Sequence, residues 1–380
     1  MTPDKTTRRR FLGRGARGLG VLAAISARPA ALLAADGPAK EAEGAEPLIA
    51  RGVAFLRPRQ DEKGGWSTRR EPGITALVVT GLLRSGQVTP SDPAITKALA
   101  YLEGSIGPNG GVSEDVHANY ATSIALLAFQ EANRNGKYDR IIKTGQDFLK
   151  GKQWDESEGK GREDPFYGGA GYGGRNSRPD LSNTTFLIDA LRETGLPPDD
   201  PSIKKAMIFV SRCQNLKGEF NDQEWAGKVN DGGFVYSTAH GGETFAGKTA
   251  DGGLRSYASM TYAGLKSMIY AGLDRDDPRV KAAMTYIKDH YTLDENPGLG
   301  QQGLYYYYHT FAKTMKVLGE PKFVDGKGAS HDWRAELIAA LKKRQQPDGG
   351  WVNPADRFLE GDPNLVTAYG LLALAYAQQK

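Results

Sequence analysis

The feature that most constrains this chain is a short pattern that recurs along it. A helical residue with a bulky apolar side chain is followed by Gln and then by Gly-Gly-Trp. The two best copies are Phe55…Gln60…Gly64-Gly65-Trp66 and Leu341…Gln345…Gly349-Gly350-Trp351. In both copies Trp stands six residues after Gln. Such units must stack on their neighbours, because one helix-turn-helix unit cannot bury its own apolar face.

Four weaker copies fill the space between these two, which gives six units about 46 residues or more apart. The equivalent helix positions are Phe55, Tyr101, Phe148, Phe209, Tyr286 and Leu341. In each unit a helix with a charged face precedes a Gly-rich turn. A second helix, apolar on all sides, follows the turn. The second helices are expected over residues 74–83, 120–129, 184–191, 257–268, 305–317 and 366–375.

A helix that is apolar on all sides is buried, so the second helices should lie inside and the first helices outside. Six such hairpins can close into a ring. The predicted fold is therefore all-α, an (α/α)6 toroid, with the starts of the inner helices around one cavity. Polar, Gly-rich insertions at about 155–179, 215–253 and 320–332 are either a binding rim or surface loops without a role.

The composition is that of a soluble globular protein, with 39% hydrophobic and 25% charged residues. No apolar run is long enough for a membrane-spanning helix. The net charge of +4 comes from residues 1–35, which carry +6 and leave about −2 for the rest. The body therefore has no basic field for nucleic acid. A single cysteine, Cys213, excludes a disulfide within the chain, and we expect it to be a core residue.

The first residues are typical of a twin-arginine signal. Thr7-Arg8-Arg9-Arg10-Phe11-Leu12 is followed by a weakly apolar run and small residues up to Ala35. We therefore predict a signal peptide over 1–35, a linker over 36–46 and the toroid over 47–380. The protein would be exported after folding and would act in the periplasm or cell envelope.

The Gln-to-Trp pattern resembles the QW motif of squalene and hopene cyclases. The wider repeat resembles the prenyltransferase and squalene-oxidase repeat superfamily, from about residue 47 to the end of the chain. The resemblance implies the α/α toroid fold and an isoprenoid-type ligand. Trp66 and Trp351 are expected to pack against neighbouring hairpins, with Gln reaching backbone groups at a helix end.

The catalytic signatures of this superfamily are incomplete in this chain. Class II terpene cyclases carry D-x-D-D-T, whose middle Asp protonates an alkene. The matching stretch is Asp180-Leu181-Ser182-Asn183-Thr184, in which that Asp is replaced by Ser182. A literal D-x-D-D at 274–277 precedes an outer helix and is interpreted as a capping loop. A zinc site like that of the prenyltransferases would need a Cys near 251–257, and none is there, so no metal and no cofactor is predicted.

The candidate site residues lie on the inner helices. Asp180 and His309 are the acid–base candidates, and His309 is alternatively a satisfied core residue. The run at 305–308 groups Tyr305 with Tyr308 and His309 on one helix face, which either faces the ring interior or packs between helices. The expected substrate-binding residues are His117, Tyr120, Asn183, Tyr257, Tyr262, Tyr305, Tyr308, Asn364 and Tyr369. Aromatic faces suit an apolar or cationic ligand.

Three functions remain open on the sequence. The first is an exported toroid that binds an apolar, isoprenoid-like ligand and isomerises or cyclises it. The second is a non-catalytic module that holds a cell-envelope component, with peripheral membrane contact left open. The third is a polysaccharide-acting enzyme, for which Asp115 and Asp180 are the nearest pair of carboxylates. Fold alone does not choose between them.

Overall fold

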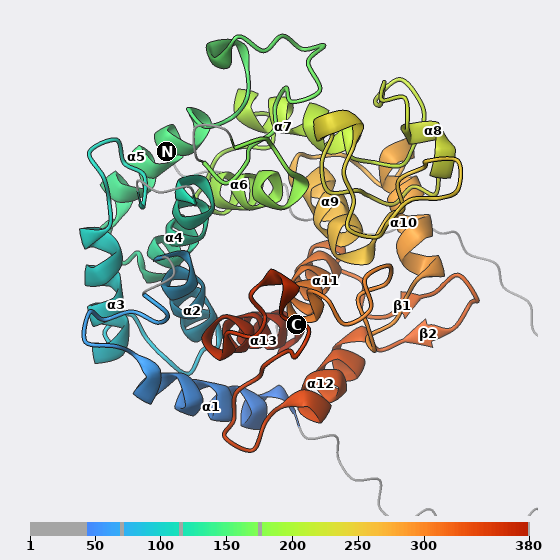
Figure 1. The fold of residues 1–380 in the computed structure, drawn as a ribbon. Coiled ribbons are helices and arrows are strands. Elements are labelled where there is room, and N and C mark those ends of the chain that lie inside the picture. The colour runs from blue at the N-terminus through green and yellow to red at the C-terminus, as the bar shows by residue number, and fades with distance from the viewer. Residues whose placement is uncertain (1–43, 69–71, 114–116, 174–176, 379–380) are drawn as a thin grey trace, which may run out of the picture. The chain divides into compact units, whose positions relative to one another are not determined.

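Two concentric sets of helices build the folded part of this chain (Figure 1). The computed structural model describes residues 44–68, 72–113, 117–173 and 177–378. These residues belong to one compact unit, Ala42–Lys380. The predicted signal peptide, the linker up to residue 43 and the candidate Asp115 lie outside the described residues.

Each of six hairpins pairs an outer helix with the inner helix that follows it. The outer helices are α1 (Ala45–Leu56), α3 (Pro93–Gly104), α5 (Asp139–Lys150), α7 (Pro201–Arg212), α10 (Pro278–Asp289) and α12 (Trp333–Arg344). The inner helices are α2 (Pro72–Arg84), α4 (Ala118–Ala132), α6 (Leu181–Glu193), α9 (Ala258–Tyr270), α11 (Leu304–Leu318) and α13 (Pro363–Gln378). These helices cover the six pairs of stretches that the repeat predicts.

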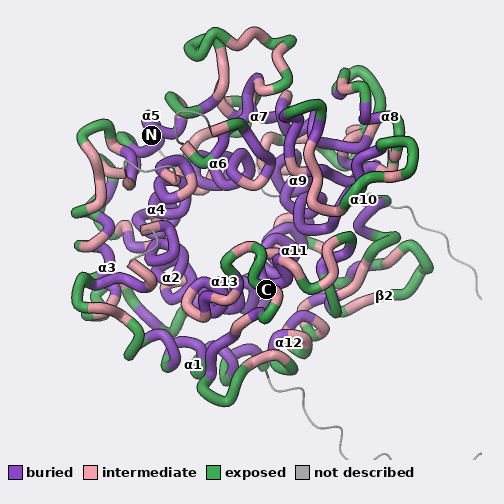
Figure 2. Tube along the Cα trace, in the orientation of Figure 1, coloured by how far each residue is buried: buried purple, intermediate pink, exposed green. Residues whose placement is uncertain are grey.

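The inner helices form a closed ring. Each packs against the next one along the chain, and α13 packs against α2, so the last unit meets the first. The inner helices are buried over most of their length, whereas the outer helices expose one face (Figure 2). The predicted (α/α)6 toroid is therefore confirmed.

In four of the six units, the Gln of the repeat joins the unit to the next one. Its side-chain amide donates both to the turn of its own unit and to the start of the next outer helix. Gln60 Nε2 bonds the carbonyl oxygens of Gly64 and Ala94, each at 2.7 Å. Gln153 and Gln214 make the same pair of bonds in their units. Gln345 Nε2 bonds Leu48 O at 2.9 Å and so ties the last unit to α1.

The Trp of the repeat is a packing residue. Trp66 and Trp351 are fully buried, and their indole N–H groups donate to Leu56 O (2.8 Å) and Leu341 O (2.9 Å). A buried polar backbone atom at the end of an outer helix is thereby satisfied. These hydrogen bonds join each Trp to the outer helix of its own unit, whereas the sequence predicts packing against the neighbouring hairpin.

A threonine near the start of the inner helix completes most units. Its hydroxyl accepts the N–H of the residue that follows the Gly pair. Such bonds join Thr75 to Trp66, Thr122 to Val112, Thr184 to Ala170, Thr261 to Phe234 and Thr367 to Trp351. The turn and the inner helix are therefore locked together in five of the six units.

The insertions and connecting loops carry the remaining short elements. These are η2 (Arg57–Arg59), η3 (Glu156–Glu158), α8 (Ala226–Val229), η4 (Ala239–Gly241), η5 (Asp356–Phe358) and the antiparallel strands β1 (Phe323–Val324) and β2 (Ser330–His331). Asp277 caps α10 by accepting the N–H of Arg279 at 2.9 Å, as the capping interpretation of 274–277 predicts. Asp200 caps α7 in the same way.

Candidate functional site

A cavity of about 430 Å³ lies where the inner helices begin. All six hairpins contribute to its wall, through residues at or near the starts of their inner helices. The loops before α6, α9, α11 and α13 add the rim. Its size falls within the range of about 300–1,000 Å³ that is typical of small-molecule sites.

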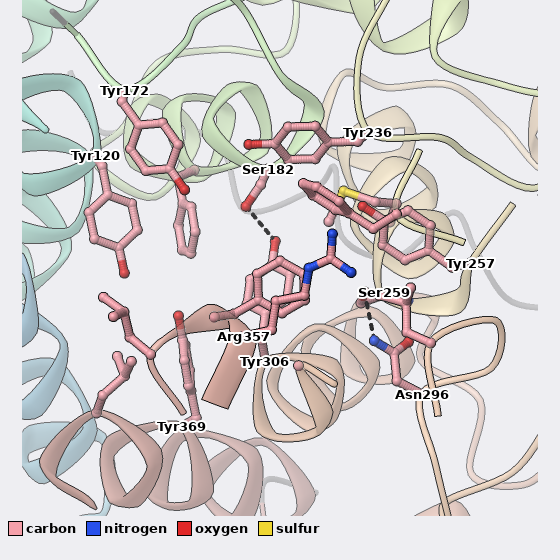
Figure 3. Close-up of a pocket in the computed structure, with 18 of the residues that line it drawn as sticks. Tyr120, Tyr172, Ser182, Tyr236, Tyr257, Ser259, Asn296, Tyr306, Arg357 and Tyr369 are labelled. Atoms are coloured by element: carbon pink, nitrogen blue, oxygen red, sulfur yellow. Dashed lines mark hydrogen bonds between the residues drawn. The ribbon is translucent and has the colours of Figure 1, made fainter. Parts of the chain in front are cut away.

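The wall of this cavity is aromatic and carries hydroxyl groups (Figure 3). Six tyrosines line it: Tyr120, Tyr172, Tyr236, Tyr257, Tyr306 and Tyr369. Phe186 joins two sides of the wall, because its ring lies 5.4 Å from that of Tyr120 and 6.1 Å from that of Tyr306. No Asp or Glu occurs among the described residues that line the cavity. The site therefore offers a broad apolar surface with scattered hydrogen-bonding groups.

Four of the substrate-binding residues expected from the sequence lie in this wall. They are His117, Tyr120, Tyr257 and Tyr369. Ser182 lines the cavity as well, and its hydroxyl lies 3.1 Å from the hydroxyl of Tyr306. The position that matches the cyclase acid thus faces the cavity, but a hydroxyl stands there instead of a carboxylic acid.

Asp180 lies just behind the wall and is 2% exposed. It caps α6: its carboxylate accepts the backbone N–H and the side-chain amide of Asn183, each at 2.8 Å. Burial raises the pKa of Asp180 to about 6, although hydrogen bonds from Asn183 and the cavity residue Tyr236 act in the opposite direction. Asp180 therefore touches the cavity through Tyr236, while Asn183 serves to position Asp180.

The tyrosine that faces the cavity from α11 is not one of the two that the sequence analysis grouped with His309. Tyr306, not Tyr305 or Tyr308, lines the cavity. Tyr308 donates its hydroxyl to Leu293 O at 2.7 Å, and the ring of Tyr305 packs against it at 5.7 Å. The interior stripe of α11 is spaced by three and four residues from Tyr306 through His309 to Lys313.

Two other candidates also lie away from the described cavity wall. Tyr262 packs edge-to-face with Phe311, with ring centroids 5.1 Å apart, in the core between α9 and α11. Asn364 donates its amide to Ser67 Oγ at 3.0 Å, between the sixth and first units. Both positions are structural in this arrangement.

His309 lies one turn below Tyr306, with its ring between those of Tyr369 and Tyr376. Burial, reinforced by the charges of Lys313 and Lys266, holds the pKa of His309 well below its usual range. The neutral form of the imidazole is therefore favoured at physiological pH. Its buried Nδ1 atom has no hydrogen-bond partner among the described residues.

The carboxyl ends of the inner helices are bridged by a buried ionic network. Lys313 of α11 binds Asp189 and Glu193 of α6, each at 2.6 Å. Arg84 of α2 pairs with Glu131 of α4 at 2.7 Å and with Glu193. Because α6 neighbours neither α2 nor α11 in the ring, these bonds cross its interior. Lys266 of α9 and Tyr376 of α13 complete the network through Asp189 and Arg84. We call this network the ionic floor. It lies toward the opposite ends of the same inner helices from the cavity, which we call the cup.

Sequence reasoning missed the rim residues that come from connecting loops. These are Tyr172, Tyr236, Phe245, Asn296, Leu299, Arg357, Phe358 and Leu359. Helical periodicity carries no information about a loop that folds back over a ring. The position of the insertions between the hairpins was the only available signal, and it left their role open.

The described residues hold no group of three or more His, Cys, Asp or Glu side chains arranged to bind a metal ion. Within the same residues, no helix has the length and apolar character needed to cross a membrane.

No protein-family model and no curated protein sequence matches this chain. Solved structures match it by fold. One is a variant of the type II terpene cyclase MstE from Scytonema with its substrate geranylgeranyl dihydroxybenzoate (14% identity, TM-score 0.55, 88% of this chain and 97% of that one). Another is a glycosyl hydrolase of family 88 from Bacteroides vulgatus (10%, 0.52, 88% and 99%). A third is protein geranylgeranyltransferase-I from Candida albicans with GGPP (12%, 0.52, 86% and 90%). At these identities the likeness concerns the fold alone.

Proposed function

We propose that this toroid binds an apolar, isoprenoid-type ligand in the aromatic cup. The observation that carries the proposal is the cup itself, whose wall is largely apolar and aromatic. Aromatic walls bury apolar ligands and also stabilise cationic intermediates. Terpene cyclases and a prenyltransferase with the same fold bind isoprenoid molecules, which supports this class of ligand.

Binding is tested with a substitution that reduces the free volume of the cup. Farnesol is titrated into the wild type and into Ser182→Trp, and binding is measured by calorimetry. Ser182 lines the cavity, so the indole should occupy ligand space and weaken binding at least tenfold. Ser91→Trp, on an exposed loop, is the matched control and should bind like the wild type. Equal binding by both variants would place the ligand elsewhere and defeat the proposal.

We infer that a proton-driven isomerisation or cyclisation in this cup uses Asp180 and not His309. Asp180 has a pKa of about 6 and contacts the wall through Tyr236, whereas His309 is held neutral beneath Tyr369. Asp180→Asn keeps the helix cap, since Asn is as good an N-cap as Asp. Turnover of an isoprenoid should then be lost while binding remains. Full turnover in Asp180→Asn would exclude this role.

A second candidate function is binding of an envelope component without chemistry. It is favoured by Ser182 and Asn183, which stand at the two positions where the related cyclases carry acids. Native mass spectrometry of the exported protein, followed by lipid extraction, separates the two. A co-purified terpenoid supports the first function, and a ligand-free protein that retains an envelope partner supports the second.

The polysaccharide-acting alternative stays a prediction without support from the described wall. That wall contains no carboxylate, and Asp180 faces it only through Tyr236. Asp115, the other member of the pair, lies outside the described residues.

We also propose that residues 1–35 direct export by the twin-arginine route to the periplasm or cell envelope. The supporting observation is the motif around Arg8 and Arg9. Replacing both with Lys should retain the protein in the cytoplasm on cell fractionation. Unchanged export of that variant would contradict the assignment.

A further inference from the structure

One cationic side chain reaches into an otherwise neutral cup. Arg357, on η5, is the single Lys or Arg among the described residues that line the cavity. It lies between Tyr306 and Tyr257 in the close-up (Figure 3). Burial raises the pKa of Tyr257 well above its usual range, and the charge of Arg357 is near enough to act against that shift. Arg357 is exposed, so a ligand can reach it.

The guanidinium is held by aromatic rings and an amide, and not by a carboxylate. Its central carbon lies 4.8 Å from the ring centroid of Phe245 and 5.6 Å from that of Phe358. One nitrogen donates to Gln302 Oε1 at 3.1 Å. Among the described residues, no Asp or Glu forms an ion pair with it.

Other arginines near the ring are neutralised. Arg178, beside the mouth, pairs with Glu243 at 2.5 Å. Arg84, in the ionic floor, pairs with two glutamates. The charge of Arg178 also acts to lower the pKa of the nearby Asp180. Within the described part of the chain, Arg357 differs from these arginines because no carboxylate pairs with it.

A guanidinium has five N–H donors in a plane, and one of them is used here. Stacking on aromatic faces leaves the edge of that plane free for a carboxylate or phosphate, which it can bind with two parallel bonds.

From this arrangement we propose that Arg357 binds an oxyanion, a carboxylate or a phosphate, at one end of the apolar ligand. The preferred ligand is then an isoprenoid with an anionic head at the mouth and its chain in the cup. This inference rests on the proposed function, since it assumes that the cup holds the chain.

The test compares ligands that differ only at the head. Farnesol, farnesoic acid and farnesyl monophosphate are titrated into the full chain by calorimetry at low salt. We expect at least one anionic probe to bind about tenfold or more tightly than farnesol, because hydrogen bonds between charged groups are stronger than those between neutral groups. The stronger of the two anions identifies the head as carboxylate or phosphate. High salt should reduce the preference.

Arg357→Gln should abolish this preference, so that farnesol and the two anionic probes bind the variant with similar affinity. Arg255→Gln is the matched control, because Arg255 is an exposed arginine of the 244–257 loop that does not line the cavity. It should keep the full preference, which separates a local contact from a general loss of positive charge.

Two results would overturn the inference while leaving the proposed function intact. One is equal binding of all three probes by the wild type, and the other is an anion preference that survives Arg357→Gln. If the wild type binds none of the three probes, the proposed function fails together with this inference.

Discussion

The two ends of the inner ring are built from the same six helices but have opposite chemistry. At their starts the side chains are aromatic and neutral, and they surround the cup. At their ends they are charged and buried, and they bridge the ring as the ionic floor. A neutral aromatic surface tolerates being left open, whereas a buried charge is stable only with its partners in place. The open end can therefore take a ligand, and the closed end holds the ring together.

The acidic residues near the two ends also differ, because their pKa values are shifted in opposite directions. Near the cup, burial raises the pKa of Asp180 to about 6 and that of Glu360, which caps the start of α11, to about 7. In the floor, burial alone would raise the pKa of Glu193, but the charges of Arg84 and Lys313 outweigh it and hold that pKa below its usual range. The direction of each pKa shift thus depends on whether the buried carboxylate has cationic partners, as it does only at the floor in this comparison.

The largest expected effect comes from breaking the floor. Asp189→Asn leaves Lys266 and Lys313 buried without their shared carboxylate, and it should lower the free energy of unfolding by about 3–5 kcal/mol. Asp147→Asn is the matched control on α5, because its pair with Lys143 is exposed, and it should cost less than about 1 kcal/mol. Urea denaturation measures both. Equal losses would show that the floor does not carry the stability assigned to it here.

The next effect is a pH dependence of opposite sign at the two ends. Between about pH 4 and 7 the native Asp180 and Glu360 keep protons that the unfolded chain has released, so stability falls as pH rises. The contribution is on the order of 2–3 kcal/mol per group. Asp180→Asn combined with Glu360→Gln should flatten this slope in urea titrations at several pH values.

Glu193 supplies the contrast to these two acids. Its lowered pKa contributes stability that is present above the pKa of an unfolded Glu and lost as the solution becomes more acidic. Glu193→Gln should therefore destabilise the protein most at neutral pH and remove part of the loss at low pH. A slope that is the same in all these variants would contradict the contrast.

The smallest effect compares the loss of one hydroxyl at each end. Tyr306→Phe removes the contact with half-buried Ser182 in the cup and should cost about 0.5–1 kcal/mol. Tyr376→Phe removes one of the three partners of the buried guanidinium of Arg84 and should cost about 1.5–3 kcal/mol. Thermal and urea unfolding measure the pair. The reverse order would mean that the cup, and not the floor, is the rigid end.

The fold could be predicted from the repeat alone. The spacing of Gln, Gly-Gly and Trp indicates stacked hairpins, because the Gln amide bonds backbone groups of its own turn and of the next unit, as in Gln60 and Gln345. The sequence also placed His117, Tyr120, Tyr257 and Tyr369 on inner helices near their starts.

The face of α11 that points inward became clear only in the folded ring, where Tyr306 and not Tyr305 or Tyr308 lines the cup. The tertiary structure alone brought Arg357 over that cup and joined Asp189 to Lys313 across the ring. The physical reason is that repeat spacing fixes contacts between neighbouring units. The rotation of each helix, the path of loops and bonds between non-neighbouring helices depend on the closure of the whole ring.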